Sequence, residues 1–485
     1  MIRPWMAAGA VVVVTGSIGC AETYTPRPAA TFTATAGPLS AGYDAAVVAT
    51  SDGARAKTAL PPKAVELFRA DTVEAGQVPA PTMSLDEIVR LAVLRDPAIR
   101  AALAQVEAAK ADVVRASTWQ NPTVVATQSL VPFPGRPFTE DRTGGPPQLD
   151  VVVGYGLDRI VFGKRGAAIA RDKLAVDAAS AAHADRVRTR VAEAVVAYVE
   201  VLRSRALWML ALEVYKHAQR LQDVTTARNG GAGERGRVRI FLLTTHRAVI
   251  SAKATLESAR AHLRERLALR ADEPTPEPAG FPAVDRPAPP PSDEIALRVA
   301  FEARPDLQAS QRELARARAA VGAETRDGLP TLGVLGIASH QFQTQALGAP
   351  NVWSYGFGLY GTLPLFDRNQ GGVARAQAVV AASDASLAAN ALRVEAEVRT
   401  ALAEYRAAYK AITEDNEGLL RGASEMRTGI REAYAAGAKS LVEVLDAEQA
   451  FSDAMRLEIE EEAGYIRAYH LLNATVGRAV LSREP

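Results

Sequence analysis

Residues 352–360 read VWSYGFGLY, and residues 363–371 read LPLFDRNQG. In the first stretch large apolar side chains alternate with Ser and Gly, and this period of two predicts a β-strand with one aromatic face and one small or polar face. Pro364 then ends the pairing of the strand, and Asp367 or Asn369 can cap an emerging helix. A strand of about 10 residues with such faces is typical of a transmembrane β-barrel. The alternative is an amphipathic hairpin packed on a soluble core.

The same order of elements occurs twice along the chain. Residues 149–157 alternate in the same way as 352–360, and each of these strands is preceded by another expected strand, at 123–131 and 331–339. Six anchors recur in the same order, which indicates an internal repeat. They are 86–88 with 293–295, Pro97 with Pro305, Pro122 with Pro330, Phe162 with Phe366, Arg171 with Arg375, and Gly233 with Gly437. Four strands in one chain cannot close a barrel, so the barrel interpretation requires several copies of the chain.

Long helices make up most of the remaining sequence. We expect helices over 85–119, 163–229 and 367–436, the last two of which would each be about 100 Å long. Apolar residues in both long helices step by three and four, as in a heptad seam, at Val187, Val191, Ala194, Tyr198 and Val201, and at Leu387, Ala391, Val394, Val398, Ala401 and Tyr405. The expected fold is therefore mostly α, with a small transmembrane β part of four strands and long coiled-coil helical hairpins.

The first 82 residues differ in character from the rest. Residues 1–19 combine Arg3 with an apolar run and small residues, as in a secretory signal peptide. Cys20 follows directly, in a position that resembles a bacterial lipoprotein cleavage box, so lipid on Cys20 is expected; an ordinary signal peptide is the alternative. Residues 20–82 would form a low-complexity leader. The Pro-rich stretch 273–291 cannot continue a helix and separates a first repeat, 83–272, from a second, 292–481.

Composition excludes several classes of protein. Lys and Arg exceed Asp and Glu by one, which disfavours a nucleic-acid partner. One cysteine excludes a disulfide framework, and the six histidines contain no HExxH motif. The sequence contains no nucleophile elbow, P-loop or strand-linked GxGxxG motif, so neither an enzyme nor a cofactor is expected.

Residues 434–448 read YAAGAKSLVEVLDAE and predict a hairpin tip. Gly437 permits the turn. Ser440 and Glu443 have the spacing of a capping box. Glu443 and Asp446 are three residues apart and therefore lie on one face of the following helix.

With these features, residues 83–480 resemble the TolC-like outer-membrane factors of efflux and secretion systems. The segment 363–371, with Pro364, Phe366, Asp367 and Asn369, is similar to the version in the heavy-metal, CzcC-like branch. The resemblance implies a two-repeat protomer of a homotrimeric α/β-barrel channel in the outer membrane. It also implies a passive exit duct that works with a periplasmic adaptor and an inner-membrane pump. A lipid-anchored periplasmic adaptor is the alternative function, but it would need lipoyl-like and β-barrel segments around one hairpin.

The resemblance also implies roles for the tip residues. Glu443 and Asp446 would line a periplasmic gate, and the hairpin tips would dock the adaptor through Tyr434, Gly437, Lys439, Ser440, Gly233 and Arg239. At the 204-residue offset of Gly233 and Gly437, Arg239 stands opposite Glu443. Arg239 would then pair with Glu443 or Asp446 across a hairpin, or face the adaptor.

Overall fold

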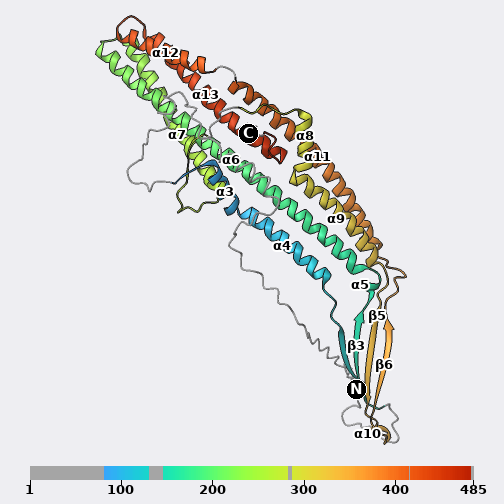
Figure 1. Cartoon of the computed structure of the whole chain (residues 1–485). Coiled ribbons are helices and arrows are strands. Elements are labelled where there is room, and N and C mark those ends of the chain that lie inside the picture. The colour runs from blue at the N-terminus through green and yellow to red at the C-terminus, as the bar shows by residue number, and fades with distance from the viewer. Residues whose placement is uncertain (1–80, 130–145, 282–286, 414–415, 482–485) are drawn as a thin grey trace, which may run out of the picture. The chain divides into compact units, whose positions relative to one another are not determined.

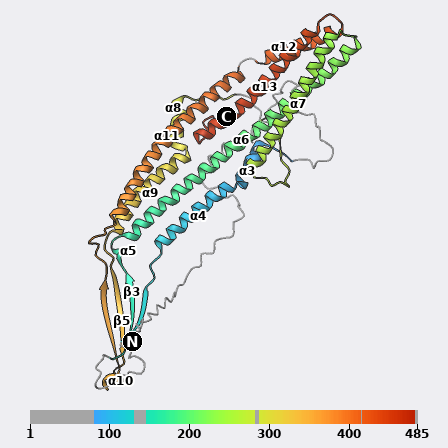
Figure 2. The same cartoon turned by 180° about the vertical axis from the view of Figure 1, so that it is seen from behind.

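The computed structural model describes residues 81–129, 146–281, 287–413 and 416–481. The expected signal peptide, Cys20 and nearly all of the leader lie outside these residues. The described chain divides into two compact units, and Figures 1 and 2 label their helices and strands. One comprises Glu107–Ala178 with Gln311–Ser386, and the other contains the remaining described residues. Each unit draws on both sequence repeats.

The first unit contains the four expected strands. They are β2 (Thr123–Ser129), β3 (Gln148–Gly156), β5 (Gly333–Gln341) and β6 (Val352–Tyr360). All pairs are antiparallel and the order is β2-β3-β5-β6, so β2 and β6 are the edges. The short helix α5 (Asp158–Val161) follows β3, and α10 (Gln343–Leu347) connects β5 to β6.

The two faces of this sheet differ as the alternation predicts. Trp353, Tyr355, Phe357 and Leu359 of β6 share one face and are 57%, 74%, 93% and 76% exposed. On the opposite face Ser339 of β5 donates a hydrogen bond to Asp150 of β3. Within the described residues, the β6 side of one face is therefore apolar and uncovered, and the other face carries the Ser339–Asp150 pair.

Helices form most of the rest of the described chain. They are α3 (Leu85–Arg95), α4 (Pro97–Ser117), α6 (Lys164–Ala227), α7 (Ala232–Arg266), α8 (Asp293–Ala303), α9 (Pro305–Asp327), α11 (Gln370–Thr413), α12 (Asn416–Ala435) and α13 (Leu441–Val476). Two-residue strands, β1 (Thr82–Met83) and β4 (Glu277–Pro278), pair in parallel. Among the described residues, no helix combines the length and the apolarity that crossing a membrane requires.

The expected single helix over 85–119 is wrong, because it breaks at Asp96. Asp96 has an extended ψ of 117° and directly precedes Pro97, whose ring disfavours the helical conformation of the preceding residue. Arg304 before Pro305 repeats the break with a ψ of 121°. The expected helix over 367–436 is described as α11 and α12, and residues 414–415 between them lie outside the described part.

A buried ion pair sits at each break, with its charges exchanged between the repeats. Asp96 accepts a hydrogen bond from Arg190 of α6, and both side chains are buried. Burial opposes ionisation of Asp96, but this bond and the Ala98 N–H hold its pKa below the usual value. The second repeat instead places Arg304 at the break.

Arg304 is fully buried and holds two carboxylates. Its Nη2 lies 2.8 Å from Asp306 Oδ2 and 2.8 Å from Glu397 Oε2 of α11, and its Nη1 donates to the Thr475 carbonyl at 3.0 Å. Arg190 follows Asp96 in the sequence by nearly the same number of residues as Glu397 follows Arg304. Each repeat therefore holds the break between its two short helices with a buried ion pair. The residue at the break is acidic in the first repeat and basic in the second.

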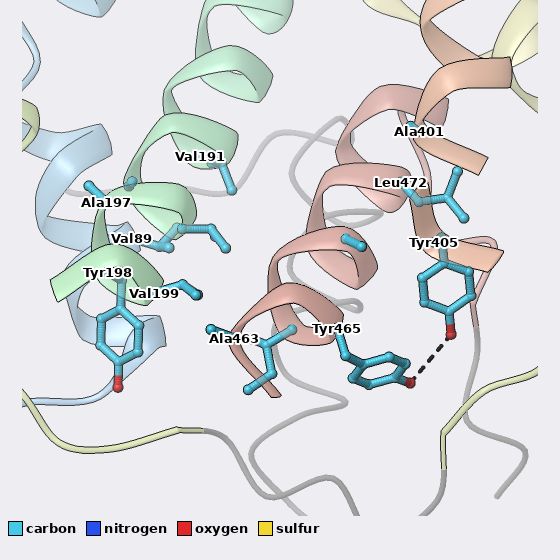
Figure 3. Close-up of a cluster of buried hydrophobic side chains, with 14 of the residues drawn as sticks. Val89, Val191, Ala197, Tyr198, Val199, Ala401, Tyr405, Ala463, Tyr465 and Leu472 are labelled. Carbon is cyan, nitrogen blue, oxygen red and sulfur yellow. Dashed lines mark hydrogen bonds between the residues drawn. The ribbon is translucent and has the colours of Figure 1, made fainter. Parts of the chain in front are cut away.

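The heptad seams form the core of the second unit (Figure 3). Tyr405 donates a hydrogen bond to the Ala288 carbonyl at 2.6 Å, and its hydroxyl lies 3.3 Å from that of Tyr465. Tyr198 donates to the Gly280 carbonyl at 2.8 Å. Burial raises the pKa of Tyr198 to about 12, so this donor stays protonated. One tyrosine from each repeat thus binds the backbone of the Pro-rich segment.

Candidate channel entrance at the hairpin tips

The turn between α12 and α13 has the structure that its sequence predicts. Ser440 is the N-cap of α13, and it exchanges hydrogen bonds with Glu443 in a complete capping box. Gly437 has a φ of +83°, and the Ala438 N–H donates to the Ala433 carbonyl at 2.8 Å. This is the Schellman arrangement that ends a helix at a left-handed residue.

The two carboxylates of the expected gate differ in their surroundings. Lys439 Nζ lies 2.5 Å from Glu443 Oε1, and this bond together with the Ser440 groups lowers the pKa of Glu443 to about 2. Asp446 is exposed and, within the described chain, forms no ion pair. The negative charge without a local counter-charge therefore belongs to Asp446.

Tyr434 connects the two hairpin tips and is 3% exposed. Its hydroxyl lies 3.1 Å from Thr225 Oγ1 of α6, and Arg228 donates to its carbonyl and stacks 4.6 Å from its ring centre. Tyr434 is therefore a positioning residue that an adaptor cannot reach in this structure. Thr225 and Arg228 carry no recognisable motif in the sequence.

The first hairpin turns earlier than the sequence alignment placed it. Asn229 has a φ of +52°, the Gly230 N–H donates to the Thr225 carbonyl at 3.0 Å, and Gly231 is the N-cap of α7. Gly233 lies inside α7, and a Cβ added there would meet nothing within 4 Å. Gly233 is therefore not the counterpart of Gly437. The counterpart of Gly437 is Asn229, and asparagine tolerates the left-handed region better than most other residues with a side chain.

The pattern of buried residues corrects the correspondence between α7 and α13, the second helices of the two hairpins. Six buried residues of the first repeat each stand 209 positions before a buried residue of α13. The pairs are Val238 with Ala447, Thr245 with Ala454, Leu256 with Tyr465, Ala259 with Ala468, Leu263 with Leu472 and Leu267 with Val476. At this offset Glu234 corresponds to Glu443, and Arg239 corresponds to Glu448. Arg239 is exposed, and the structure pairs it with neither Glu443 nor Asp446.

A buried charged cluster behind the tip was not predicted. Arg427 of α12 lies 3.1 Å from Glu213 of α6 and 3.9 Å from Glu448 of α13, and its guanidinium stacks 3.4 Å from the centre of the Phe451 ring. Arg431 approaches Glu448 to 3.6 Å. Helical spacing could have placed Arg427 and Arg431 on one face, but it does not identify acids on other helices. This cluster joins three helices just behind the entrance.

Asn369, rather than Asp367, is the residue directly before α11. Asn369 has a φ of +58°, its carbonyl accepts from the Val373 N–H at 2.9 Å, and its side chain donates to Glu324 of α9 at 2.7 Å. Asp367 instead accepts from the Asn369 N–H at 2.9 Å. Phe366 is 92% exposed, and Pro364 lies after the last residue of β6.

Residues 296–478 match the outer membrane efflux protein family. The matched residues cover most of the second repeat, 292–481. No curated protein matches the sequence. Among solved structures, the Campylobacter jejuni CmeC outer membrane channel is 16% identical with a TM-score of 0.67, over 86% of this chain and 92% of that one. The outer-membrane channel OprN is 21% identical with a TM-score of 0.61, over 81% and 90%.

These likenesses extend the efflux-protein fold over both repeats. The Neisseria gonorrhoeae MtrE outer membrane channel, in its open state, is 19% identical with a TM-score of 0.63, over 82% of this chain and 89% of that one. The chain therefore has the TolC-like fold of α/β-barrel channels. Within the described residues, no three His, Cys, Asp or Glu side chains are grouped to hold a metal ion.

The corrected glycine assignment makes a direct prediction. Gly437→Ala forces a left-handed alanine and should destabilise the hairpin by about 1–2 kcal/mol, whereas Gly233→Ala should stabilise α7 by about 0.5 kcal/mol. The midpoint of thermal unfolding of each purified variant measures both effects. Equal destabilisation by the two substitutions would restore Gly233 to the turn.

Proposed function

We propose that this protein is the exit duct of a tripartite efflux or secretion system, which conducts substrate passively across the periplasm and the outer membrane. The observation that carries the proposal is the four-stranded sheet. Among the described residues, nothing covers its aromatic face, and its edge strands β2 and β6 each pair on one side only. In hydrocarbon an unpaired edge leaves backbone groups unsatisfied, so β6 of one copy pairs with β2 of the next until the barrel closes. The outer membrane efflux protein domain supports the same function.

Three copies give a barrel of twelve strands in the homotrimer. The hairpin tips then meet around one axis, with Glu443 and Asp446 lining the gate. Because Lys439 already neutralises Glu443 within each chain, the three Asp446 carboxylates supply the attraction for cations. Lys439 and Gly437 at the exposed turn are available to a periplasmic adaptor, which connects the duct to an inner-membrane pump.

Lipid on Cys20 completes the anchoring to the outer membrane. The cysteine follows a signal-like segment directly, and one lipid adds modest affinity to that of the barrel. Mass spectrometry of the mature protein should find a diacylated or triacylated Cys20 as the first residue. Cys20→Ala should remove the lipid and leave the protein in the outer-membrane fraction. An intact, unmodified Cys20 or cleavage elsewhere would contradict this assignment.

The function is tested by fractionation and single-channel recording. The purified protein should come from the outer membrane, have the mass of three chains by light scattering in detergent, and form discrete channels in planar bilayers. A monodisperse water-soluble monomer after signal removal would overturn the exit-duct function and favour the adaptor.

A further inference from the structure

The polar side chains of the sheet gather at one end of the face opposite the aromatic residues. This is the end at which α10 connects β5 to β6, away from α5 (Figure 1). Here Gln148 of β3 is in register with Gln341 of β5. The next row on this face contains one residue from each strand: Thr127, Asp150, Ser339 and Ser354. The two rows after it are mostly apolar or glycine: Val125, Val152, Ile337 and Gly356, then Thr123, Gly154, Leu335 and Gly358.

Asp150 dominates the charge of this part of the chain. Among the described residues of β2, β3, β5 and β6, it is the only Asp, Glu, Lys or Arg. The segment between β2 and β3 adds two basic and two acidic residues, which cancel: Arg136, Glu140, Asp141 and Arg142. The segment 342–351 between β5 and β6 contains no charged residue. The strands and their connections therefore carry one net negative charge, which Asp150 supplies.

Hydrogen bonds hold the Asp150 carboxylate in place on this face. Ser339 Oγ and Gln148 Nε2 both donate to Asp150 Oδ1, the latter at 2.6 Å. Gln148 in turn accepts from Gln341 Nε2 at 3.4 Å. Because both donors to Asp150 are neutral groups, these bonds orient the carboxylate and leave its negative charge in full.

We propose that Asp150 is a specificity-determining residue at the outer mouth of the duct, where three copies form a ring of carboxylates that favours cations over anions. This inference rests on the proposed function, because closure of the barrel turns the aromatic face to lipid and the polar face to the lumen. The α10 end of the sheet is then the outer end, since helices α5 and α6 follow β3 from the opposite end. The ring adds a second selective level to the one proposed at the hairpin tips.

The width of the barrel decides how far this ring acts. Twelve strands spaced by about 4.8 Å and tilted by about 40° enclose a barrel about 24 Å across, which places each carboxylate roughly 8 Å from the axis. The Debye length is about 30 Å at 0.01 M salt and about 3 Å at 1 M. The three carboxylates therefore act across the whole lumen in dilute salt, but only near its wall in concentrated salt.

Reversal potentials of single channels in planar bilayers test this ring in the full-length protein. With the gate neutralised by Glu443→Gln and Asp446→Asn, adding Asp150→Asn should lower the ratio of potassium to chloride permeability by about fivefold at 0.01 M KCl. At 1 M KCl the same substitution should change the ratio by less than about 1.5-fold. Asparagine has the size of aspartate and still accepts both hydrogen bonds, so the shape of the pore is kept.

A second variant adds charge to the row without removing a hydrogen bond of Asp150. Ser354 of β6 is exposed and in register with Ser339. Ser354→Asp should therefore raise the permeability ratio at 0.01 M KCl and leave it nearly unchanged at 1 M KCl. This variant decides the question even if Asp150→Asn fails to assemble.

Thiol modification tests whether the side chain at position 150 faces the lumen. In Asp150→Cys, an anionic methanethiosulfonate reagent should form a mixed disulfide, release methanesulfinate and restore the cation preference, whereas a cationic reagent should lower it further. Val151→Cys is the matched control, because Val151 is the next residue and shares the opposite face with Tyr355. Neither reagent should change the permeability ratio of Val151→Cys or of the wild type, which contains Cys20.

The outcomes separate this inference from the proposed function. Channels whose permeability ratio at 0.01 M KCl is unchanged by both Asp150→Asn and Ser354→Asp overturn the outer ring alone. Changes of equal size at 0.01 M and 1 M KCl also overturn it, because they reflect the shape of the pore rather than its charge. A wild-type protein that forms no channels, or that is a monomer by light scattering, overturns the exit-duct function itself.

Discussion

Replacing Arg304 with leucine should lower the free energy of unfolding by about 3 kcal/mol, since removing one partner of a buried ion pair leaves the other charge buried without it. Asp306 is the charge that stays buried, because its side chain is 9% exposed, whereas Glu397 can turn toward water. Arg393, which is largely exposed, still lies 3.4 Å from Asp306 and compensates its charge only in part. The midpoint of thermal unfolding of the purified protein measures the loss. Arg312→Leu is the matched control: Arg312 pairs with Asp177 at 3.0 Å, but both side chains are about half exposed, so its loss should stay below about 1 kcal/mol.

A second variant separates charge from packing at this site. Arg304→Leu combined with Asp306→Asn removes both charges and should recover part of the stability. The direction in which the stability loss changes with pH follows from Asp306. Its pKa is lowered, because the hydrogen bonds and charge of Arg304 outweigh the effect of burial. Its stabilisation is present above the ordinary carboxyl pKa of about 4 and is lost as pH falls below it. The deficit of Arg304→Leu should therefore shrink in acid. Equal losses in the free energy of unfolding for Arg304→Leu and Arg312→Leu would show that the buried ion pair stabilises the protein no more than an exposed one.

Neutralising the gate should change conduction more than stability. Asp446→Asn with Glu443→Gln removes charge, while glutamine keeps the capping box with Ser440. In planar bilayers this variant should conduct better than the wild type, be less sensitive to block by multivalent cations, and lose about fivefold in cation preference, equivalent to about 1 kcal/mol for one unscreened carboxylate near the ion. Asp446→Asn alone should produce most of the change in cation preference, because Lys439 already neutralises Glu443.

The matched control for the gate uses carboxylates away from the tips. Asp384 and Glu404 lie on exposed positions of α11, and Asp384→Asn with Glu404→Gln should leave conductance and selectivity unchanged. Unchanged conductance in the gate variant, with trimer assembly intact, would place the constriction elsewhere and leave Glu443 and Asp446 as surface residues.

Local patterns predicted the elements of this protein well. The alternation in 352–360 gave β6 with its faces correctly assigned, and Ser440 with Glu443 gave the capping box. Both patterns are short-range, because strand pleating and helix capping depend on neighbours within a few residues. The break at Asp96 was missed although Pro97 encodes it locally.

Long-range correspondence was harder to predict. Gly233 was matched to Gly437 because both are glycines, but the turn belongs to Asn229. The error moved Arg239 opposite Glu443, and only the burial of α7 and α13 corrected it. The cluster around Arg427 could not be predicted, because its partners come from helices whose relative rotation the sequence does not specify.

The aromatic face of β6 has a consequence for the life of the newly made chain. Phe357 is 93% exposed beside Tyr355 and Leu359, and one edge of β6 pairs with no other strand in the part of the chain that the structure describes. In water such a surface promotes aggregation of identical chains. In the proposed exit duct, a free protomer would therefore need an escort between the secretion machinery and the lipid, and its insertion would have to coincide with its pairing with sister chains.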